Sequence, residues 1–346
     1  MTNKEKLINQ KCKSTGIGSV PHTDINAIAD LIINKCPSLP YWPQIVNADP
    51  REGMLTQYTE NLPCLKLNKN NEVIFDGTLK DEQVLKFYEH LTSSDYDYFK
   101  ISREYAHGFY TLIEKLKSSK IDFVKGQVVG PVTLLYSLKG DDGKPLLFDD
   151  MLSDAVIRGL AMKAVWQAKE IKKIGKAPVI FFDEPAMSGF GSAFMPLSKE
   201  QATNIFDKLI DTVKEHEDVI TGMHCCGNSD WEMLLQTKID IINFDSFAFS
   251  ENFVLFSESI KKFLNRGGII AWGAVPTSDY RKGITLDIII NKVNNAADKL
   301  AGKGIDRNML FKQSVFTPAC GMGTLSKEIA EKILDLTNKL ALHFTN

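Results

Sequence analysis

The feature that most constrains the fold of this chain is an alternation of short apolar segments with longer amphipathic ones. The candidate strands are apolar runs rich in β-branched and aromatic residues, at 16–20, 123–129, 179–183, 219–225, 240–245, 268–273 and 314–317. Between them, apolar residues recur at helical spacing in segments such as 154–173, 199–215, 286–301 and 326–342. This alternation predicts a parallel sheet wrapped by helices.

Most of these candidate strands end in polar or reactive residues that are followed by Gly or Pro. Examples are Val129-Gly130-Pro131, Asp183-Glu184-Pro185 and His224-Cys225-Cys226-Gly227. Functional side chains at the carboxyl ends of several parallel strands are typical of the TIM barrel. A doubly wound sheet usually concentrates its ligand at one switch point, and no Gly-x-Gly-x-x-Gly follows a candidate strand here. We therefore predict an α/β protein with the fold of a single (β/α)8 TIM barrel.

One stretch, at about 36–97, departs from this alternation. It contains Pro37, Pro40, Pro43 and Pro50, and two β-rich runs flank the polar residues 68–71. This pattern indicates an irregular excursion with a hairpin inserted after the first strand. The chain has no low-complexity linker and no internal repeat, so we predict one domain over residues 1–346 with this insertion.

Composition and charge exclude several classes of partner. The net charge is −2, from 41 basic and 43 acidic residues, which leaves no electrostatic footprint for nucleic acid or an anionic membrane. No run approaches the ~20 apolar residues that a membrane span needs, and the polar N-terminus does not resemble a secretory signal. Six cysteines in 346 residues are too sparse for a disulfide scaffold. We expect reduced thiols in a cytoplasmic protein.

The strongest chemical signal is a divided set of soft metal ligands, His224, Cys226 and Cys320. His224 and Cys226 are two residues apart, so on an extended strand they point to the same side while Cys225 points away. One imidazole and two thiolates suit Zn²⁺, with the fourth position open as in a catalytic site. The alternative is that these side chains are unrelated. Asp245, at the end of the following strand, either supplies an oxygen ligand or caps the next helix.

Two carboxylates and one histidine at strand ends are further candidates. Asp183 and Glu184 leave a buried strand together and should point in different directions, so we expect only one of them to line a pocket. Such a carboxylate could hold a substrate ammonium group or guide a proton, or it could simply favour a helix N-terminus. His22 follows the first strand and could donate a proton, although a lone histidine is more often structural. His22 and Glu184 are the candidate catalytic residues.

Taken together, the motifs resemble the catalytic barrel of cobalamin-independent methionine synthase. They occur in order as Ile17-Gly18-Ser19, Gly130-Pro131-Val132-Thr133, Phe182-Asp183-Glu184-Pro185-Ala186, His224-Cys225-Cys226 and Pro318-Ala319-Cys320-Gly321-Met322-Gly323-Thr324. The wider superfamily includes uroporphyrinogen decarboxylase and corrinoid-dependent thiol methyltransferases. The resemblance spans nearly the whole chain, in a short, single-barrel form.

The resemblance implies a role for particular residues. His224, Cys226 and Cys320 match the family's zinc ligands. Asp245 falls about where the family places a Glu ligand, but its side chain is shorter. The segment Ile17, Gly18 and Ser19 matches the part that holds the carboxylate of homocysteine. Asp183 matches the acid that holds its amino group.

The departures from the family concern the methyl donor. The segment 271–276 lacks the His that donates a proton in the family. Gly189 stands about where the family has an acidic residue that contacts folate, and glycine cannot serve in that role. Tyr136 and Ser137 stand where the family has a Trp near the pterin. The long enzyme's first barrel is also missing. These differences weaken 5-methyltetrahydrofolate as the donor and favour a methylcorrinoid, on a separate corrinoid protein or as free methylcobalamin.

We therefore expect a zinc-dependent methyltransferase that acts on a small thiol, with homocysteine as the best candidate. A thiol is mostly protonated at neutral pH, and metal binding deprotonates it. One alternative is a corrinoid-linked transferase for another thiol such as coenzyme M, which would not need Asp183. A second is a non-catalytic zinc-binding barrel with a closed, four-ligand site. A porphyrinogen decarboxylase fits least, because the strand ends quoted above contain no Arg for a polycarboxylate.

Overall fold

The computed structural model describes residues 1–11, 13–192, 195–278, 280 and 283–345. Its strands are β1 (Leu65–Leu67), β2 (Val73–Phe75), β3 (Phe123–Val129), β4 (Ala177–Asp183), β5 (Ile220–Cys225), β6 (Ile241–Phe244), β7 (Ile269–Val275) and β8 (Ser314–Pro318). Its α-helices are α1 (Asn3–Ile8), α2 (Ile25–Lys35), α3 (Lys80–Thr92), α4 (His107–Leu116), α5 (Pro131–Ser137), α6 (Asp150–Lys173), α7 (Lys199–His216), α8 (Trp231–Gln236), α9 (Ser246–Phe253), α10 (Ser257–Asn265), α11 (Leu286–Gly302), α12 (Arg307–Lys312) and α13 (Lys327–Thr345).

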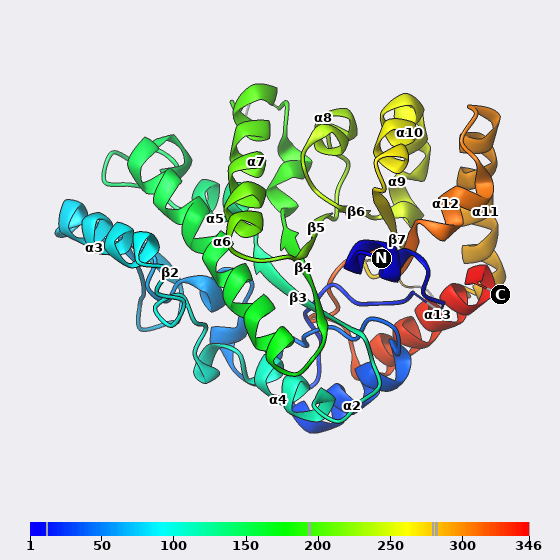
Figure 1. Ribbon diagram of the computed structural model, residues 1–346, viewed down its shortest axis with the longest axis horizontal. Helices are drawn as coiled ribbons and strands as arrows, with labels where there is room; N and C mark the ends of the chain where they lie inside the picture. The colour runs from blue at the N-terminus through cyan, green and yellow to red at the C-terminus, as the bar shows by residue number, and fades with distance from the viewer. Residues whose placement is uncertain (12, 193–194, 279, 281–282, 346) are drawn as a thin grey trace.

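Strands β3 to β8 form one parallel sheet in which each strand pairs with its neighbour in the sequence. Figure 1 shows this sheet curling through the centre of the molecule, with helices ranged around it. Six of the predicted strands are therefore confirmed to within a few residues, as is the α/β class. Long apolar runs such as Val179–Phe182 predict buried strands well because both of their faces are covered.

The predicted first strand, at 16–20, is not a regular strand. Instead, parallel bridges link Ser14 to Phe316 of β8, Tyr41 to Lys125 of β3, and Ser19 to Gln44. Two extended segments, near 14–19 and 41–44, thus connect the two edges of the six-stranded sheet. Proline lacks the N–H that a ladder requires, so Pro40 and Pro43 limit the second segment to isolated bridges.

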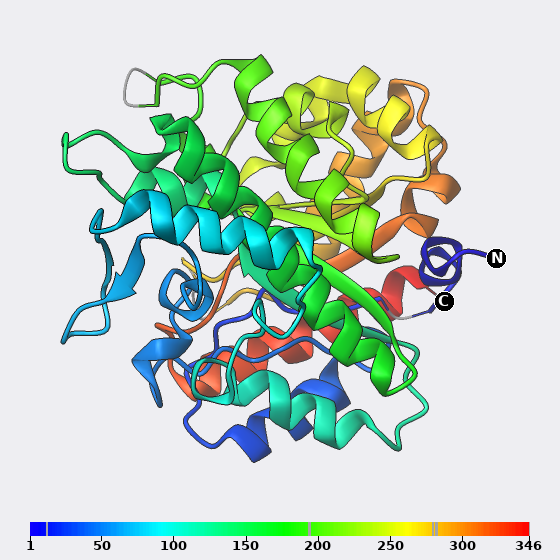
Figure 2. The same ribbon diagram turned by 60° about the vertical axis from the view of Figure 1, so that its left-hand side comes forward.

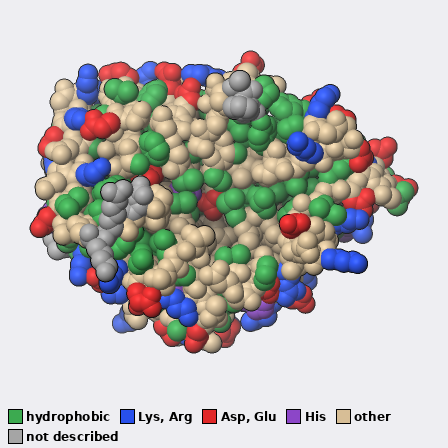
Figure 3. Space-filling view, turned by 180° about the vertical axis from the view of Figure 1, so that it is seen from behind, with side chains coloured by type: hydrophobic (Ala, Val, Ile, Leu, Met, Phe, Trp, Pro, Cys, Tyr) green, Lys and Arg blue, Asp and Glu red, His purple; other side chains and the backbone are tan. Residues whose placement is uncertain are grey.

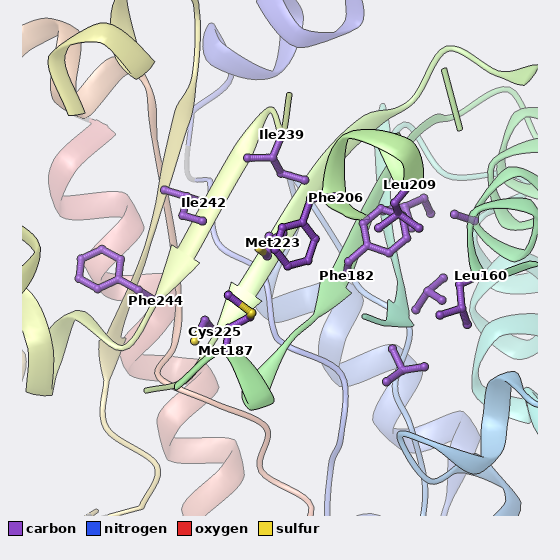
Figure 4. Packing of buried hydrophobic residues seen from close by; sticks show 14 of the residues in the cluster. Leu160, Phe182, Met187, Phe206, Leu209, Met223, Cys225, Ile239, Ile242 and Phe244 are labelled. Atoms are coloured by element: carbon purple, nitrogen blue, oxygen red, sulfur yellow. The ribbon is translucent and has the colours of Figure 1, made fainter. Parts of the chain in front are cut away.

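The hydrophobic core has two parts, one on each face of the curled sheet. A small inner cluster holds every second residue of the strands together with Leu7 from α1, and it includes Phe123, Val179, Phe181, Ile220, Ile241, Ile269, Ala271 and Val315. The larger outer cluster packs the other residues of the strands against the helices, as Figure 4 shows for Phe182 beside Phe206 and Leu209. This alternation fixes which side chains can reach the interior of the sheet at its carboxyl end.

The inserted segment contains the predicted hairpin and also helices that the sequence pattern did not reveal. β1 and β2 pair antiparallel across the turn at 68–71, which confirms the hairpin. Helix α3 then lies beside α6 (Figures 1 and 2). The single domain over residues 1–346 stays a prediction. Among the described residues, no helix combines the length and the apolar character needed to cross a membrane.

Candidate metal centre

The strand register brings one row of polar side chains to the carboxyl end of the sheet. Val179 and Phe181 belong to the inner core, so Asp183, two residues further along β4, points to the same side. Asp183 pairs with His224 of β5, His224 pairs with Asn243 of β6, and Asn243 pairs with Ala271 of β7. The first three side chains of this row are polar, and they lie above the apolar inner core.

His224, Cys226 and Cys320 meet at this end of the sheet. Their candidate ligand atoms all lie within 4.8 Å of one another. The imidazole is 2% exposed, and both thiols are partly buried. Cys225 turns to the outer face and lies near Met187 (Figure 4), so the structure brings together the three residues predicted as ligands and directs Cys225 away from them.

A hydrogen-bond network fixes the orientation of the His224 ring. The amide nitrogen of Asn243 donates hydrogen bonds to the carbonyl oxygen of Ala271 and to Thr317 Oγ1, at 2.8 and 2.9 Å. Its Oδ1 is therefore an acceptor, and it lies 2.5 Å from Nδ1 of His224, which must donate. Nε2 then carries the lone pair, and it is buried with no hydrogen-bond partner among the described residues. The network leaves that nitrogen free to bind a cation.

Asp245 lies at the end of β6, but its carboxylate serves a helix. Oδ1 accepts a hydrogen bond of 2.9 Å from the backbone N–H of Ala248 and so caps α9. Burial raises the pKa of this carboxyl. Asp245 is not part of the group formed by His224, Cys226 and Cys320, so its role as a fourth ligand stays a prediction.

A cavity of about 480 Å³ opens beside the three candidate ligands. It is lined by Ile17, Ser19, Gln44, Val46, Asn47, Glu52, Gly53, Met54, Asp183, Pro185, His224, Cys226, Cys320, Gly321, Gly323 and Thr324. Among the described residues that line it there are two carboxylates and no Lys or Arg. One face of the molecule is visibly hollowed, with acidic atoms in the hollow and hydrophobic side chains on both sides (Figure 3).

Asp183 lines this cavity as a buried carboxylate with a free oxygen. The residue is 5% exposed, and its Oδ1 has no hydrogen-bond partner among the described residues. Burial raises the pKa of Asp183 to about 6, although the charges of Lys125 and His224 oppose this rise. A buried acceptor without a partner is costly, so this oxygen is suited to a donor brought in by a ligand.

The two cysteines of the cluster differ in proton affinity. The pKa of the Cys226 thiol is lowered, because Cys226 accepts a hydrogen bond from Cys320 and lies against His224. The pKa of Cys320 rises, because its thiol donates to Cys226. Thiolates are the form that binds metal ions, so the lowered pKa of Cys226 favours the form that a metal ligand requires.

The segment predicted to hold a substrate carboxylate lies at the cavity only in part. Ile17 and Ser19 line the cavity, whereas Gly18 packs against Gln44 and Gln127. Ser19 Oγ accepts a hydrogen bond of 3.3 Å from the backbone N–H of Gly323. A Cβ at Gly321 would lie 2.2 Å from that hydroxyl, so glycine is required there for the two segments to meet.

The two candidate catalytic residues lie away from the cavity lining. His22 is 6% exposed, and its Nε2 lies 3.3 Å from Glu331 of α13. Glu184 is wholly buried at the N-terminus of α5. Its carboxylate accepts hydrogen bonds from the backbone N–H of Val132 at 2.9 Å and from the backbone N–H of Thr133 at 2.8 Å. It also accepts one from the hydroxyl of Thr133 at 2.6 Å. As expected, only one carboxylate of the Asp-Glu pair lines the cavity.

Glu184 explains why two of the sequence motifs belong together. A Cβ at Gly130 would lie 2.1 Å from Glu184 Cδ, so the glycine makes room for the carboxylate to reach the helix. The Gly130-Pro131-Val132-Thr133 motif thus supplies the N–H groups that bind the Glu184 carboxylate, while Asp183 faces the cavity. Burial raises the pKa of Glu184 to about 7 in spite of the hydrogen bonds that lower it.

Replacing Glu184 by Ala should destabilise the protein. The change leaves two buried backbone N–H groups without acceptors, and we expect the free energy of unfolding to fall by roughly 2 to 4 kcal/mol. Urea unfolding followed by circular dichroism measures this loss. Glu215→Ala, which removes an exposed carboxylate from α7, is the control and should change stability by less than about 0.5 kcal/mol. Equal stability of both variants would contradict the capping role.

The sequence pattern does not single out three residues of the site: Asn243, Gln44 and Glu52. Asn243 stands two residues before Asp245, and strand alternation could have placed it on the inner face. Gln44 and Glu52 lie in the irregular stretch, where no periodicity indicates which side chains turn inward.

Comparisons with known proteins identify a similar fold but no family. No family model matches the chain, and no curated protein matches it. A methyltransferase from Methanosarcina mazei has a similar solved structure, with a TM-score of 0.53 and 15% identity over 96% of this chain and 91% of that one. A structure of the pneumococcal exo-β-D-N-acetylglucosaminidase catalytic modules gives a TM-score of 0.47 and 12% identity over 99% of this chain and 86% of that one. The first likeness supports a shared fold.

Proposed function

We propose that this protein is a zinc-dependent methyltransferase that transfers a methyl group to a thiol, with homocysteine as the acceptor. The observation that carries the proposal is one imidazole nitrogen without a partner beside two thiols, at a cavity that also holds the free oxygen of Asp183. The structural neighbour described as a methyltransferase supports the reaction class. We interpret the curled sheet and its two bridging segments as an eight-stranded barrel with two reduced strands.

The donor set fits zinc. Zn²⁺ binds imidazole nitrogen and thiolate sulfur, and catalytic sites use three protein ligands with one position open. His224, Cys226 and Cys320 would supply three such ligands, and Asn243 supplies the second-shell contact that orients a ligating imidazole. A non-catalytic site would be closed by a fourth ligand, but the fourth ligand that the sequence predicts, Asp245, caps α9 through Oδ1.

Bound zinc would supply a Lewis acid that converts the substrate thiol to a thiolate near neutral pH. The protein's residues account for the rest of the site. Two Cys thiolates would keep a bound sulfur electron-rich, which suits nucleophilic attack on a methyl group. Asp183 would accept hydrogen bonds from the substrate's ammonium group, and the segment that contains Ile17 and Ser19 would face its carboxylate.

The charge of the cavity favours homocysteine over an anionic thiol. Asp183 and Glu52 face the cavity without a Lys or Arg among the described lining residues. A sulfonate thiol such as coenzyme M would bring an anion but no cation, so the buried carboxylate of Asp183 would stay without a partner, and unpaired buried charges are costly. An α-amino thiol instead brings an ammonium group to Asp183.

The proposed methyl donor is a methylcorrinoid, either free or on a partner protein. A direct assay supplies the protein and zinc with homocysteine and either methylcobalamin or 5-methyltetrahydrofolate, and follows methionine by mass spectrometry. We expect methionine with methylcobalamin. Methionine formed only from the folate would overturn the proposed donor, and no product with any thiol or donor would favour the non-catalytic alternative.

Replacing Asn243 by Ala should weaken metal binding without removing a ligand. The change frees the His224 ring to rotate or shift its tautomer, and loss of such a contact typically costs roughly 10- to 100-fold in metal affinity. Competition with a chromophoric chelator measures the zinc dissociation constant. Asn295→Ala, at an exposed position of α11, is the control. Identical zinc affinities in the two variants would show that the network does not position a ligand.

A further inference from the structure

The proposed reaction releases one proton that must leave the cavity. A thiol and a methyl donor give a thioether, the demethylated donor and the proton of the S–H group. Five titratable residues are among the described residues lining the cavity: Glu52, Asp183, His224, Cys226 and Cys320. The last three are the proposed ligands, and Asp183 is the proposed ammonium partner. Glu52 is therefore the proton acceptor left unassigned.

Glu52 lies at the boundary between the cavity and the inserted segment. It is fully buried, and its Oε2 accepts a hydrogen bond of 3.2 Å from the backbone N–H of Ile45. Its Oε1 accepts one of 3.3 Å from Gly108 at the start of α4. This carboxylate has no direct contact with solvent, so a proton that reaches it needs a further carrier.

His107 provides that carrier. Its Nδ1 lies 3.3 Å from Glu52 Oε1 and makes no hydrogen bond with any described residue. The His107 side chain is 38% exposed, whereas that of Glu52 is 0% exposed. The pair thus joins a buried carboxylate on the cavity wall to an imidazole that reaches solvent.

The surrounding charges leave Glu52 able to exchange protons near neutral pH. Burial raises its pKa to about 7, the backbone N–H groups of Ile45, Gly108 and His107 lower it, and the charge of Asp49 raises it. Arg51 is engaged in ion pairs with Asp49 and Glu104. Tyr58 also lies near, since the charges of Asp183 and Glu52 add to the burial that raises its pKa.

We infer that Glu52 and His107 form the exit route for the proton of the substrate thiol. This inference rests on the proposed function. The S–H bond breaks with its electron pair remaining on sulfur, the proton passes to the Glu52 carboxylate, and His107 transfers it from Glu52 to solvent. Glu52 returns to its ionised form, so no other reactant is consumed. The route makes the insertion part of the active site.

Glu52 also has a structural role, which the test must separate from proton transfer. Helix α4 has no side-chain cap of its own, and Glu52 accepts the N–H of Gly108 in its first turn. Glu52→Gln keeps the shape of the side chain and one of its two acceptor oxygens, so one of the N–H groups of Ile45 and Gly108 loses its acceptor, and the amide cannot carry the proton. His107→Gln interrupts the second step. Glu104→Gln, which removes an exposed carboxylate that pairs with Arg51, is the matched control.

The experiment mixes zinc-loaded protein with homocysteine in weakly buffered solution and follows proton release with a pH indicator in a stopped-flow instrument. In the unmodified protein and in Glu104→Gln we expect rapid release whose rate rises with pH around 7, as Glu52 ionises. In Glu52→Gln and His107→Gln the rate should fall by roughly tenfold or more, and Glu52→Gln should lose this pH dependence. Added imidazole should restore the rate in His107→Gly.

Two outcomes would overturn the inference, and they differ in what else they affect. If Glu52→Gln releases the proton as fast as the unmodified protein, the route is wrong but thiol activation stands. If the unmodified protein neither releases a proton nor gains a sulfur ligand at zinc, the proposed function fails together with the route. Urea unfolding of each variant shows whether a slow rate reflects damage to α4.

Discussion

Replacing Cys320 by Ser should remove zinc from the protein and abolish methyl transfer while leaving the fold intact. A serine hydroxyl stays protonated at neutral pH and cannot replace a thiolate as a ligand to zinc. The metal contributes several kcal/mol to such a reaction, so we expect activity to fall by more than about a thousandfold. Cys320 is only partly buried, which limits the effect on stability.

The matched control for this prediction is Cys225→Ala. Cys225 is adjacent to Cys226 in sequence but lies in the outer core, so its loss should cost some stability while zinc content and activity remain. Elemental analysis, activity and far-UV circular dichroism should be measured on both variants. A metal-free Cys320→Ser protein with full activity would end the proposed mechanism.

Replacing Asp183 by Asn should impair the reaction with homocysteine and spare thiols that lack an amino group. The buried carboxylate has one free oxygen, and a hydrogen bond between charged groups contributes about 1.5 to 3 kcal/mol. We therefore expect kcat/KM for homocysteine to fall by roughly 10- to 100-fold. The value for 4-mercaptobutyrate, which is homocysteine without its amino group, should change little.

Comparing the two substrates separates loss of the ammonium contact at Asp183 from general damage to the zinc site. A general disturbance of the zinc site would lower kcat/KM for both thiols by the same factor, because His224 lies directly beside Asp183 in the sheet. Equal losses would therefore contradict the proposed ammonium contact. No loss with either thiol would favour the coenzyme M type of transferase, which has no use for Asp183.

The sequence predicted the buried part of the fold well for a physical reason. Strands covered on both faces are continuous apolar runs, and the run that predicts a strand at 123–129 coincides with β3. The spacing of two residues between His224 and Cys226 placed both on one side of β5. The same alternation separates Asp183 from Glu184, and the structure sends only Asp183 to the cavity.

The rest of the site depends on contacts that local patterns do not encode. Glu52 owes its position to Ile45 and Gly108, and the latter is 56 residues away in the chain. The first strand is reduced to bridges because its partner segment contains Pro40 and Pro43. Asp245 presented two alternatives in the sequence, and its hydrogen bond to Ala248 shows that it does cap the following helix.

The measurement that tests the central claim most directly is X-ray absorption at the zinc edge of the purified protein, before and after homocysteine is added. We predict one zinc per chain, bound by one nitrogen and two sulfur ligands from the protein, with one further sulfur ligand when homocysteine binds. Zinc with an unchanged ligand shell would contradict homocysteine activation. A protein that binds no zinc would contradict the metal site itself.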